Sequence, residues 1–381
     1  MAKFLVIHPN MDIYGGGERV AHHILKALVA HGQNVELLAF DFDPNRYANI
    51  LGEKLPDGVT VHMLGKRIEA EPPFSVYKRR RKIIQAVREF KNSTDYDYTF
   101  STQTLSAFET ELYNKAKKNI AYVHFPEIHY DYDHAKRSAK IYLWLYKKWL
   151  EGGIGKLNLV FCNSEYTKAM TQKYWGKFEV AEPVVAYPPV EDQFWSNKPL
   201  GERAKRVVYI GRFIPQKRHE LMKKLAAEFP TFEFASVGLL RDTEEAWFEE
   251  FAKDLPSNYV LKPNLPEAQL VALLQDSRIY VHLMEGEHFG IAPMEALASG
   301  CITLVHNSGG SGELIPEEFR WTTYEDLKHK IAQLIAPNGS EAWENKKQQL
   351  RDKISVLRPE NFQSTIWSHV QALMGQTENA I

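Results

Sequence analysis

The sequence predicts an α/β fold in which two doubly wound parallel-sheet domains follow one another and face each other across a cleft. The chain has 381 residues, more than the roughly 100–200 residues usual for a single domain. Short apolar runs rich in β-branched residues alternate with longer segments of helical period, as in parallel sheets wrapped by helices. This alternation stops at a stretch rich in proline and polar residues near 187–201 and then starts again.

The interruption defines the domain limits. We expect a first domain over residues 1–190 and a second over residues 203–358. The tail beyond residue 324 is mostly of helical period, and its last helix, at about 359–381, is expected to pack back on the first domain.

Each expected element has the pattern of a buried strand or of a helix that covers a sheet. The helix expected over 18–30 has apolar residues on one face, at Val20, Ile24, Ala27 and Leu28. Strands are expected at 4–8, 35–39, 60–64, 98–101, 120–124 and 159–163, and in the second domain at 207–210, 232–237, 259–261, 279–283 and 302–305. Further helices are expected near 216–228, 243–253, 267–275 and 293–299.

Composition argues against several classes of protein. Hydrophobic residues make up 44% and charged residues 25% of the chain, and the formal net charge of −1 disfavours a nucleic-acid partner bound through bulk positive charge. No stretch has the apolar length of a signal peptide or of a spanning helix, so a cytoplasmic location is expected. The two cysteines, Cys162 and Cys301, suit buried thiols in a reducing compartment.

The segment 282–300 carries the most chemical information. A buried strand ends there in an acidic loop, and a helix is expected to begin near Pro293, since proline is favoured in a first helical turn. The backbone N–H groups of Phe289, Gly290 and Ile291 would lie near the positive end of that helix, where a diphosphate can bind.

Two carboxylates flank the same turn. Glu287 precedes it and Glu295 lies within the first turns of the helix, so each can accept hydrogen bonds from sugar or ribose hydroxyls. The alternative is an acidic turn that only complements the helix dipole.

A pair of cations follows a strand in the second domain. Gly211 ends an apolar run, and Arg212 and Lys217 project from the loop that follows it. Two fixed cations at the carboxyl end of a strand suit a departing diphosphate without a metal, because negative charge develops there as the glycosidic bond breaks. The alternative is that these cations only belong to a solvated basic turn. We interpret Arg218 as a solvated charge of this kind.

A glycine-rich loop lies between the first strand and the first helix. Gly15, Gly16 and Gly17 precede Glu18, and their missing side chains let the backbone approach a phosphate or a sugar. The loop has no G-x-G-x-x-G pattern, which disfavours a nicotinamide cofactor.

Polar residues follow two other strands of the first domain. His124 ends one strand beside the predicted cleft, although an isolated histidine there is often only structural. Asn163 and Ser164 follow the next strand, where they can line the same cleft or cap the helix that begins at Glu165.

Two stretches of the first half suggest contact with a membrane surface. Residues 78–82 are all basic, and residues 141–150 combine aromatic and apolar side chains with Lys147 and Lys148. Such a helix can lie in a membrane interface with its lysines near anionic headgroups. The alternative is a solvated face together with a core helix whose Trp side chains pack inward.

Taken together, these segments resemble glycosyltransferase family 4 over essentially the whole chain. The family signature of two glutamates separated by seven residues is met by Glu287 and Glu295. Segments 15–20, 123–126, 287–291 and 306–310 resemble more narrowly the family members that extend dolichyl-diphosphate-linked oligosaccharides. The resemblance implies a GT-B fold of two Rossmann-like domains, an acceptor-side domain followed by a nucleotide-sugar-binding domain.

The resemblance also implies roles for single residues. Arg212 and Lys217 would hold the donor diphosphate, Glu295 the ribose, and Glu287 a hydroxyl of the transferred sugar. His124 would line the donor sugar near the reacting carbon. The remaining positions would contact the diphosphate, the sugar or the acceptor through backbone or loop atoms: Gly15, Gly16, Gly17, Glu18, Gly309 and Gly310.

The activity implied is transfer of a hexose, with retention of anomeric configuration, from a nucleotide-diphosphate sugar to a lipid-linked or other glycan acceptor at the cytoplasmic membrane face. No metal or other cofactor is implied. GDP-mannose is the leading donor, and UDP-sugars would use the same diphosphate and ribose contacts. Two alternatives stay open: a UDP-sugar 2-epimerase of the same fold, and a non-catalytic protein that binds nucleotide sugars.

Overall fold

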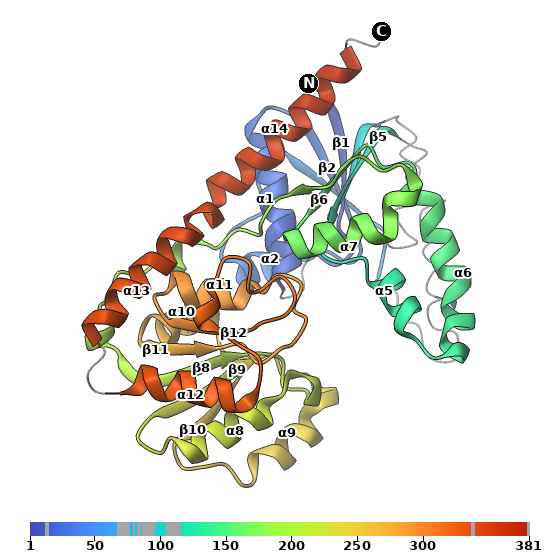
Figure 1. The fold of residues 1–381 in the computed structure, drawn as a ribbon. Coiled ribbons are helices and arrows are strands. Elements are labelled where there is room, and N and C mark those ends of the chain that lie inside the picture. Colours follow the sequence, from blue (N-terminus) through green and yellow to red (C-terminus); the bar gives the residue numbers. More distant parts are fainter. Residues whose placement is uncertain are drawn as a thin grey trace. The chain divides into compact units, whose positions relative to one another are not determined.

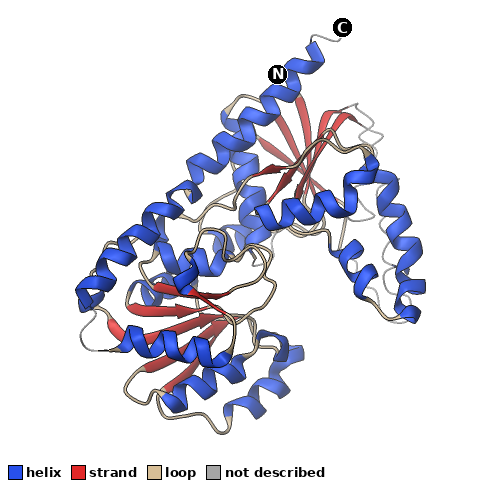
Figure 2. Ribbon diagram, viewed as in Figure 1, coloured by secondary structure: helices blue, strands red, loops and turns tan. Residues whose placement is uncertain are grey.

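The computed structural model describes residues 1–11, 15–66, 77–78, 81, 85, 96–103, 116–336 and 340–378. The chain forms two compact domains, one of Met1–Pro189 with Pro359–Ile381 and one of Val190–Arg358. Each is an α/β domain in which helices cover a parallel sheet (Figures 1 and 2). The predicted fold class is therefore confirmed.

The first sheet has the strand order β3-β2-β1-β4-β5-β6-β7, and every pair of neighbours is parallel. Its strands are β1 (Lys3–Ile7), β2 (Asn34–Ala39), β3 (Val59–Met63), β4 (Tyr96–Ser101), β5 (Ala116–Val123), β6 (Leu159–Cys162) and β7 (Val184–Val185). The first-domain helices are α1 (Gly16–Ala30), α2 (Pro44–Leu51), α5 (Glu127–His134), α6 (Arg137–Ile154), α7 (Glu165–Trp175) and α14 (Pro359–Glu378), with a short 3-10 turn η2 (Gly176–Phe178).

Helix α14, from the end of the chain, packs beside helix α1, from the beginning of the chain (Figure 1). Its apolar residues recur every three to four positions and share the core of the first sheet with α1, at Phe362, Ile366, Val370 and Leu373. The Trp367 ring stacks on His31 with centroids 4.1 Å apart. The two ends of the chain thus build one domain.

The second sheet has the order β10-β9-β8-β11-β12-β13, again with parallel neighbours. Its strands are β8 (Ala204–Ile210), β9 (Glu233–Gly238), β10 (Tyr259–Pro263), β11 (Ser277–Val281), β12 (Ile302–His306) and β13 (Arg320–Trp321). The helices are α8 (His219–Glu228), α9 (Glu245–Ala252), α10 (Glu267–Gln275), α11 (Ile291–Ala298), α12 (Tyr324–Ile335) and α13 (Ser340–Lys353). Short 3-10 turns are η3 (Asp192–Phe194), η4 (Leu200–Glu202), η5 (Pro215–Lys217), η6 (Asp242–Glu244), η7 (Glu317–Phe319) and η9 (Ile354–Leu357).

The structure also shows features that the sequence pattern did not predict. The strands β7 and β13 have two residues each, too short to give a recognisable alternation. Residues 190–202, which have the composition of a linker, belong to the second domain, where Phe194 and Leu200 are buried. Among the described residues, no helix combines the length and apolar character needed to cross a bilayer.

Both cysteines are buried, as expected. Burial raises the pKa of the Cys162 thiol and of the Cys301 thiol to about 12, so both stay protonated at neutral pH. A thiol in that state is a poor nucleophile.

Each sheet has a point at which the strand order reverses direction. In the first sheet it lies between β1 and β4, and in the second between β8 and β11. Ligands of doubly wound sheets bind at the carboxyl ends of the strands on either side of such a point. The loops that follow these four strands are therefore where a site is expected in each domain.

The contact between α14 and α1 leads to a stability prediction. Ile366→Ala removes a fully buried side chain from the core that these helices share, and should destabilise the first domain by about 2–5 kcal/mol. Amide hydrogen exchange should accelerate in α1 while strands β8 to β12 keep wild-type rates. Gln371→Ala, on the exposed face of α14, is the matched control. Unchanged exchange in α1 would contradict this packing account.

Candidate functional site

The loop after β8 carries the predicted cations. Arg212 is exposed, and Lys217 is half-buried and ends the turn η5. Helix α8 begins at His219, three residues later than predicted, because Arg218 has a left-handed backbone (φ 58°). The loop passes so close to β9 that a Cβ on Gly238 would lie 1.9 Å from the carbonyl oxygen of Gly211.

The acidic loop follows β11, the neighbour of β8. It bends at Gly286 (φ 66°) and Gly290 (φ 86°), both in the left-handed region that glycine tolerates. Gly290 is the N-cap, so α11 begins at Ile291, and the predicted start near Pro293 is wrong by two residues. Proline is tolerated there because the first-turn N–H groups have no partner within a helix.

The side chains of this segment differ in their exposure to solvent. Phe289 is 2% exposed and Glu295 is 8% exposed, so both are buried against the domain. Glu287 keeps about a quarter of its side chain exposed. Of the two predicted carboxylates, Glu287 is therefore the more accessible.

The loop after β12 holds the acidic loop in place. The Gly310 N–H donates to the Glu287 carbonyl oxygen at 2.8 Å, and the Gly286 N–H donates to the Ser308 hydroxyl oxygen at 2.8 Å. Gly309 has a left-handed backbone (φ 70°), and a Cβ there would lie 2.2 Å from the same Glu287 carbonyl oxygen. The structure thus brings Glu287, Gly309 and Gly310 together.

The charge of Glu287 is stabilised by its neighbours. Burial alone would raise the pKa of this carboxyl, but the hydrogen bond from His282 and the nearby charge of Lys217 lower it to about 2. Glu287 is therefore an ionised hydrogen-bond acceptor at neutral pH, and the charge of Lys217 helps to stabilise its carboxylate.

A second link joins the β8 and β11 loops. Arg218, which we interpreted as a solvated charge, forms an ion pair with Glu285 and donates a hydrogen bond of 3.4 Å to the carbonyl oxygen of Leu283. The local sequence could not show this contact because its partners lie more than sixty residues away along the chain.

In the first domain, polar residues follow four neighbouring strands. His8, Thr102, His124 and Asn163 come directly after β1, β4, β5 and β6. The His124 Nε2–H donates to the Thr102 carbonyl oxygen at 3.0 Å, and Asn163 Nδ2 donates to the carbonyl oxygen of His124 at 2.9 Å. His124 is thus held from both sides at the carboxyl edge of the sheet, while Asn163 supports it.

The glycine loop leads into α1 next to His124. Gly15 is the extended N-cap and Gly16 the first helical residue. A Cβ on Gly17 would lie 3.6 Å from His124 Nε2, so the helix start and the histidine are neighbours. Glu18 is 7% exposed and its carboxylate lies 3.6 Å from His8 Nε2. Residues 12–14 of this loop lie outside the described residues.

Of the two roles left open for Ser164, the structure shows the helix cap. The Ser164 hydroxyl oxygen accepts a hydrogen bond from the Thr167 N–H at 3.0 Å at the start of α7.

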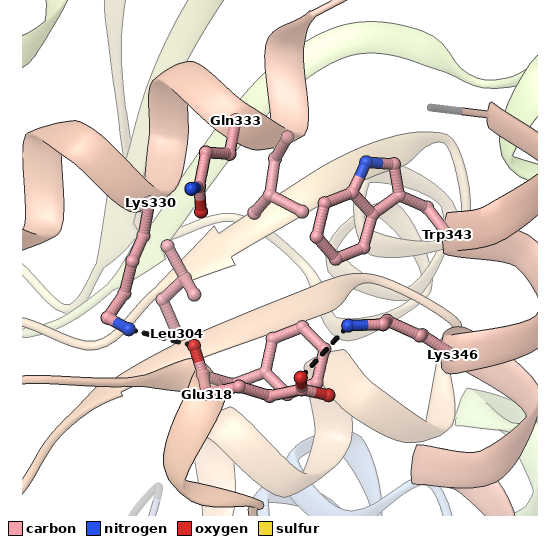
Figure 3. Close-up of a pocket in the computed structure, with 8 residues that line it drawn as sticks. Leu304, Glu318, Lys330, Gln333, Trp343 and Lys346 are labelled. Atoms are coloured by element: carbon pink, nitrogen blue, oxygen red, sulfur yellow. Dashed lines mark hydrogen bonds and ion pairs between the residues drawn. The ribbon is translucent and has the colours of Figure 1, made fainter. Parts of the chain in front are cut away.

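A pocket elsewhere in the second domain lies between η7, β12, α12 and α13 (Figure 3). Lys330 and Lys346 at its rim bind the backbone and the carboxylate of Glu318. None of the predicted site residues lines it.

Comparison with known proteins identifies the family. A family model described as Glycosyltransferase Family 4 matches residues 14–194, and one described as Glycosyl transferases group 1 matches residues 191–351. The chain belongs to glycosyltransferase family 4. Human GDP-Man:Man(3)GlcNAc(2)-PP-Dol α-1,2-mannosyltransferase is 25% identical, over 96% of this chain and 86% of the relative. The Dictyostelium discoideum protein of that name is 22% identical, over 97% and 84%.

Solved structures share the GT-B fold of this family 4 glycosyltransferase. Sucrose-phosphate synthase from Thermosynechococcus elongatus superposes with a TM-score of 0.73 at 18% identity, over 100% of both chains. HepE from Anabaena in complex with UDP and glucose gives 0.71 at 16% identity, over 98% of this chain and 100% of that one. WaaG, a glycosyltransferase involved in lipopolysaccharide biosynthesis, gives 0.72 at 12% identity, over 95% and 99%.

The close approach at Gly309 can be tested by stability. Gly309→Ala and Gly286→Ala both place a side chain on a left-handed backbone, which costs about 1–2 kcal/mol. Only the alanine at 309 meets backbone atoms, whereas the one at 286 meets nothing within 4 Å. The melting temperature of Gly309→Ala should therefore fall below that of Gly286→Ala. Equal melting temperatures would show that the two loops do not interlock in this way.

Proposed function

We propose that this family 4 glycosyltransferase is a retaining hexosyltransferase that uses a nucleotide-diphosphate sugar, with GDP-mannose as the leading donor and a UDP-sugar as the alternative. The observation that supports the proposal is that the loops on either side of the switch point between β8 and β11 carry Lys217 and an ionised Glu287, whose pKa the charge of Lys217 helps to lower. The name of the human relative includes GDP-Man, and HepE binds UDP and glucose.

The second domain supplies contacts of two kinds. Arg212 and Lys217 bind the diphosphate and stabilise the negative charge that grows on it as the sugar departs, so the reaction needs no metal. Glu287 accepts hydrogen bonds from a hydroxyl of the transferred sugar, and Glu295 from the ribose. The backbone at Phe289, Gly290, Ile291, Gly309 and Gly310 completes the contacts to phosphate and sugar.

For the first domain, we propose roles that rest on the family resemblance and on local geometry. His124 contacts the donor sugar near the reacting carbon, and its position after β5 is fixed by Asn163 and Thr102. Gly16 and Gly17 at the start of α1 let the acceptor or the diphosphate approach the backbone. Gly15 and Glu18 shape this loop. In a front-face mechanism the leaving phosphate oxygen takes the proton of the acceptor hydroxyl, so no side chain acts as a nucleophile.

The role of Lys217 can be tested by removing its charge. Lys217→Ala should lower turnover by at least about 100-fold, because charge stabilisation in the transition state is lost. Lys205→Ala removes an exposed lysine near the amino end of β8, at the other edge of the sheet, and should leave turnover unchanged. The measurement is release of GDP or UDP from the donor in the presence of acceptor. Wild-type rates for Lys217→Ala would refute the assignment, and inversion at C2 of the sugar without an acceptor would show an epimerase.

We propose that the acceptor is lipid-linked and that the enzyme works at the cytoplasmic membrane face, in contact with the bilayer through α6. Figure 1 shows α6 beside α5. Buried residues occur in α6 only near its carboxyl end, from Leu150 onward. In contrast, Ile141 is 74% and Trp144 is 52% exposed. The interpretation as a core helix with inward Trp side chains does not hold for Trp144.

The exposed face of α6 combines apolar and basic residues. Arg137, Ile141, Trp144, Leu145 and Lys148 follow one another at helical spacing, and each is exposed. An apolar centre with a cation at each end matches an anionic bilayer, in which the apolar side chains enter the interface and the cations meet headgroups. Of the basic run at 78–82, residues 79, 80 and 82 lie outside the described residues, so the proposal rests on α6.

Membrane contact can be tested with two tryptophans of one helix. Trp144→Ala should weaken sedimentation with liposomes that contain phosphatidylserine, because it removes the exposed aromatic ring of α6. Trp149→Ala is the matched control, since Trp149 is half-buried and packs edge-on against Tyr77 with centroids 5.6 Å apart. Equal binding by wild type and Trp144→Ala would rule out this surface.

A further inference from the structure

A layer of buried aromatic side chains lies under the loops that carry the proposed donor contacts. Tyr209 and His219 have ring centroids 5.1 Å apart, and Tyr209 and His282 have centroids 6.4 Å apart. All three residues are at most 3% exposed. They come from the end of β8, the start of α8 and the residue after β11. None belongs to the set of residues to which a ligand contact has been assigned above.

Each of the three residues has one polar atom that bonds to a proposed contact residue. The Tyr209 hydroxyl donates to the Lys217 carbonyl oxygen at 2.7 Å. The His219 Nε2–H donates to the Arg212 carbonyl oxygen at 2.9 Å, and the His282 Nε2–H lies 3.3 Å from the Glu287 carboxylate. One buried residue therefore supports each of the three residues proposed to contact the diphosphate and the sugar, through the backbone at Lys217 and Arg212 and through the side chain at Glu287.

The two histidines can act as donors in these hydrogen bonds. Burial lowers the pKa of His219 to about 4, so the ring is neutral at pH 7, and its Nε2 carries the proton because a carbonyl oxygen can only accept. The Tyr280 hydroxyl lies 3.3 Å from His282 Nδ1, where it can donate. His282 Nε2 is then the donor to Glu287, whether the ring is neutral or charged.

We propose that Tyr209, His219 and His282 are positioning residues, which fix the backbone of Lys217, the backbone of Arg212 and the carboxylate of Glu287 for binding of a nucleotide-diphosphate sugar. This inference rests on the proposed function and adds the residues on which the site's geometry depends. Burial in the core is also what a purely structural layer would show, so the test needs readouts that core packing alone would not change.

The first readout compares two buried tyrosine hydroxyls. Tyr209→Phe keeps the ring and removes only the bond to the Lys217 carbonyl. Affinity for GDP-mannose or UDP-glucose, measured by titration calorimetry, should fall about tenfold, the equivalent of one lost hydrogen bond. Tyr259→Phe is the matched control, because the Tyr259 hydroxyl is buried at the amino end of β10 and bonds Ser236 at 2.6 Å. It should bind like wild type.

The second readout is the pH dependence of the same binding. The titratable groups around Glu287 are His282, Lys217, His288, Tyr209 and Tyr280. Because its pKa is lowered to about 2, the wild-type carboxylate stays ionised above about pH 4, and its contribution to binding is lost only as the pH falls toward 2. In His282→Leu, burial is no longer offset by the hydrogen bond, so the pKa of Glu287 rises and affinity should fall between pH 7 and pH 4.5. His282→Gln keeps an N–H donor and should restore the flat profile.

The outcomes separate the two claims. A tenfold loss for Tyr209→Phe, with wild-type binding by Tyr259→Phe and an acid-sensitive profile in His282→Leu that His282→Gln corrects, supports positioning. Wild-type affinity and pH profile in Tyr209→Phe and in folded His282→Leu would overturn it while the proposed function stands. Equal losses in Tyr209→Phe and Tyr259→Phe would also overturn it, because they would show general destabilisation. Failure of the wild-type protein to bind any nucleotide sugar would overturn the proposed function and this inference together.

Discussion

The arrangement of the second domain's loops depends on one close backbone contact, in which Gly309 passes over the Glu287 carbonyl with no room for a side chain between them. The Gly310 N–H bonds to the same carbonyl oxygen, and Ser308 binds the N–H of Gly286. These contacts make the loops after β11 and β12 one unit. The close approach and the left-handed backbone require glycine at position 309.

A carboxylate in such a loop would ordinarily be costly to bury. Glu287 stays ionised because His282 donates to it and because Lys217 lies within electrostatic range. The same lysine belongs to the cation pair proposed to hold a diphosphate. The Glu287 carboxylate is therefore stabilised before any ligand arrives, and a preorganised charged group of this kind loses little free energy to rearrangement during reaction.

Much of the fold and several of the candidate site residues could be predicted from the sequence, because local patterns of apolar and polar residues indicate them. The strand and helix periods predict both sheets apart from the two-residue strands β7 and β13, and Glu287, Arg212 and Lys217 are recognisable as candidates because each lies in the loop after a buried strand. The supporting residues were not recognisable: Tyr209, His219 and His282 look like ordinary core residues, since their partners lie on other elements. The start of α11 was misplaced because Pro293 fits several positions of a first turn, whereas Gly290 determines the boundary through its left-handed backbone. Likewise, only the structure separates exposed Trp144 from half-buried Trp149.

We propose that the loops after β8, β11 and β12 bind the diphosphate and sugar of a donor. Hydrogen exchange of the full chain with and without GDP-mannose, UDP-glucose and dTDP-glucose tests it directly, because a ligand that binds only the folded state slows the opening of the segments it contacts. We expect protection in 211–218, 284–291 and 306–310 with at least one of these sugars. Protection confined to other segments of the second domain, such as the pocket around Glu318, or none with any of the three, would contradict the claim.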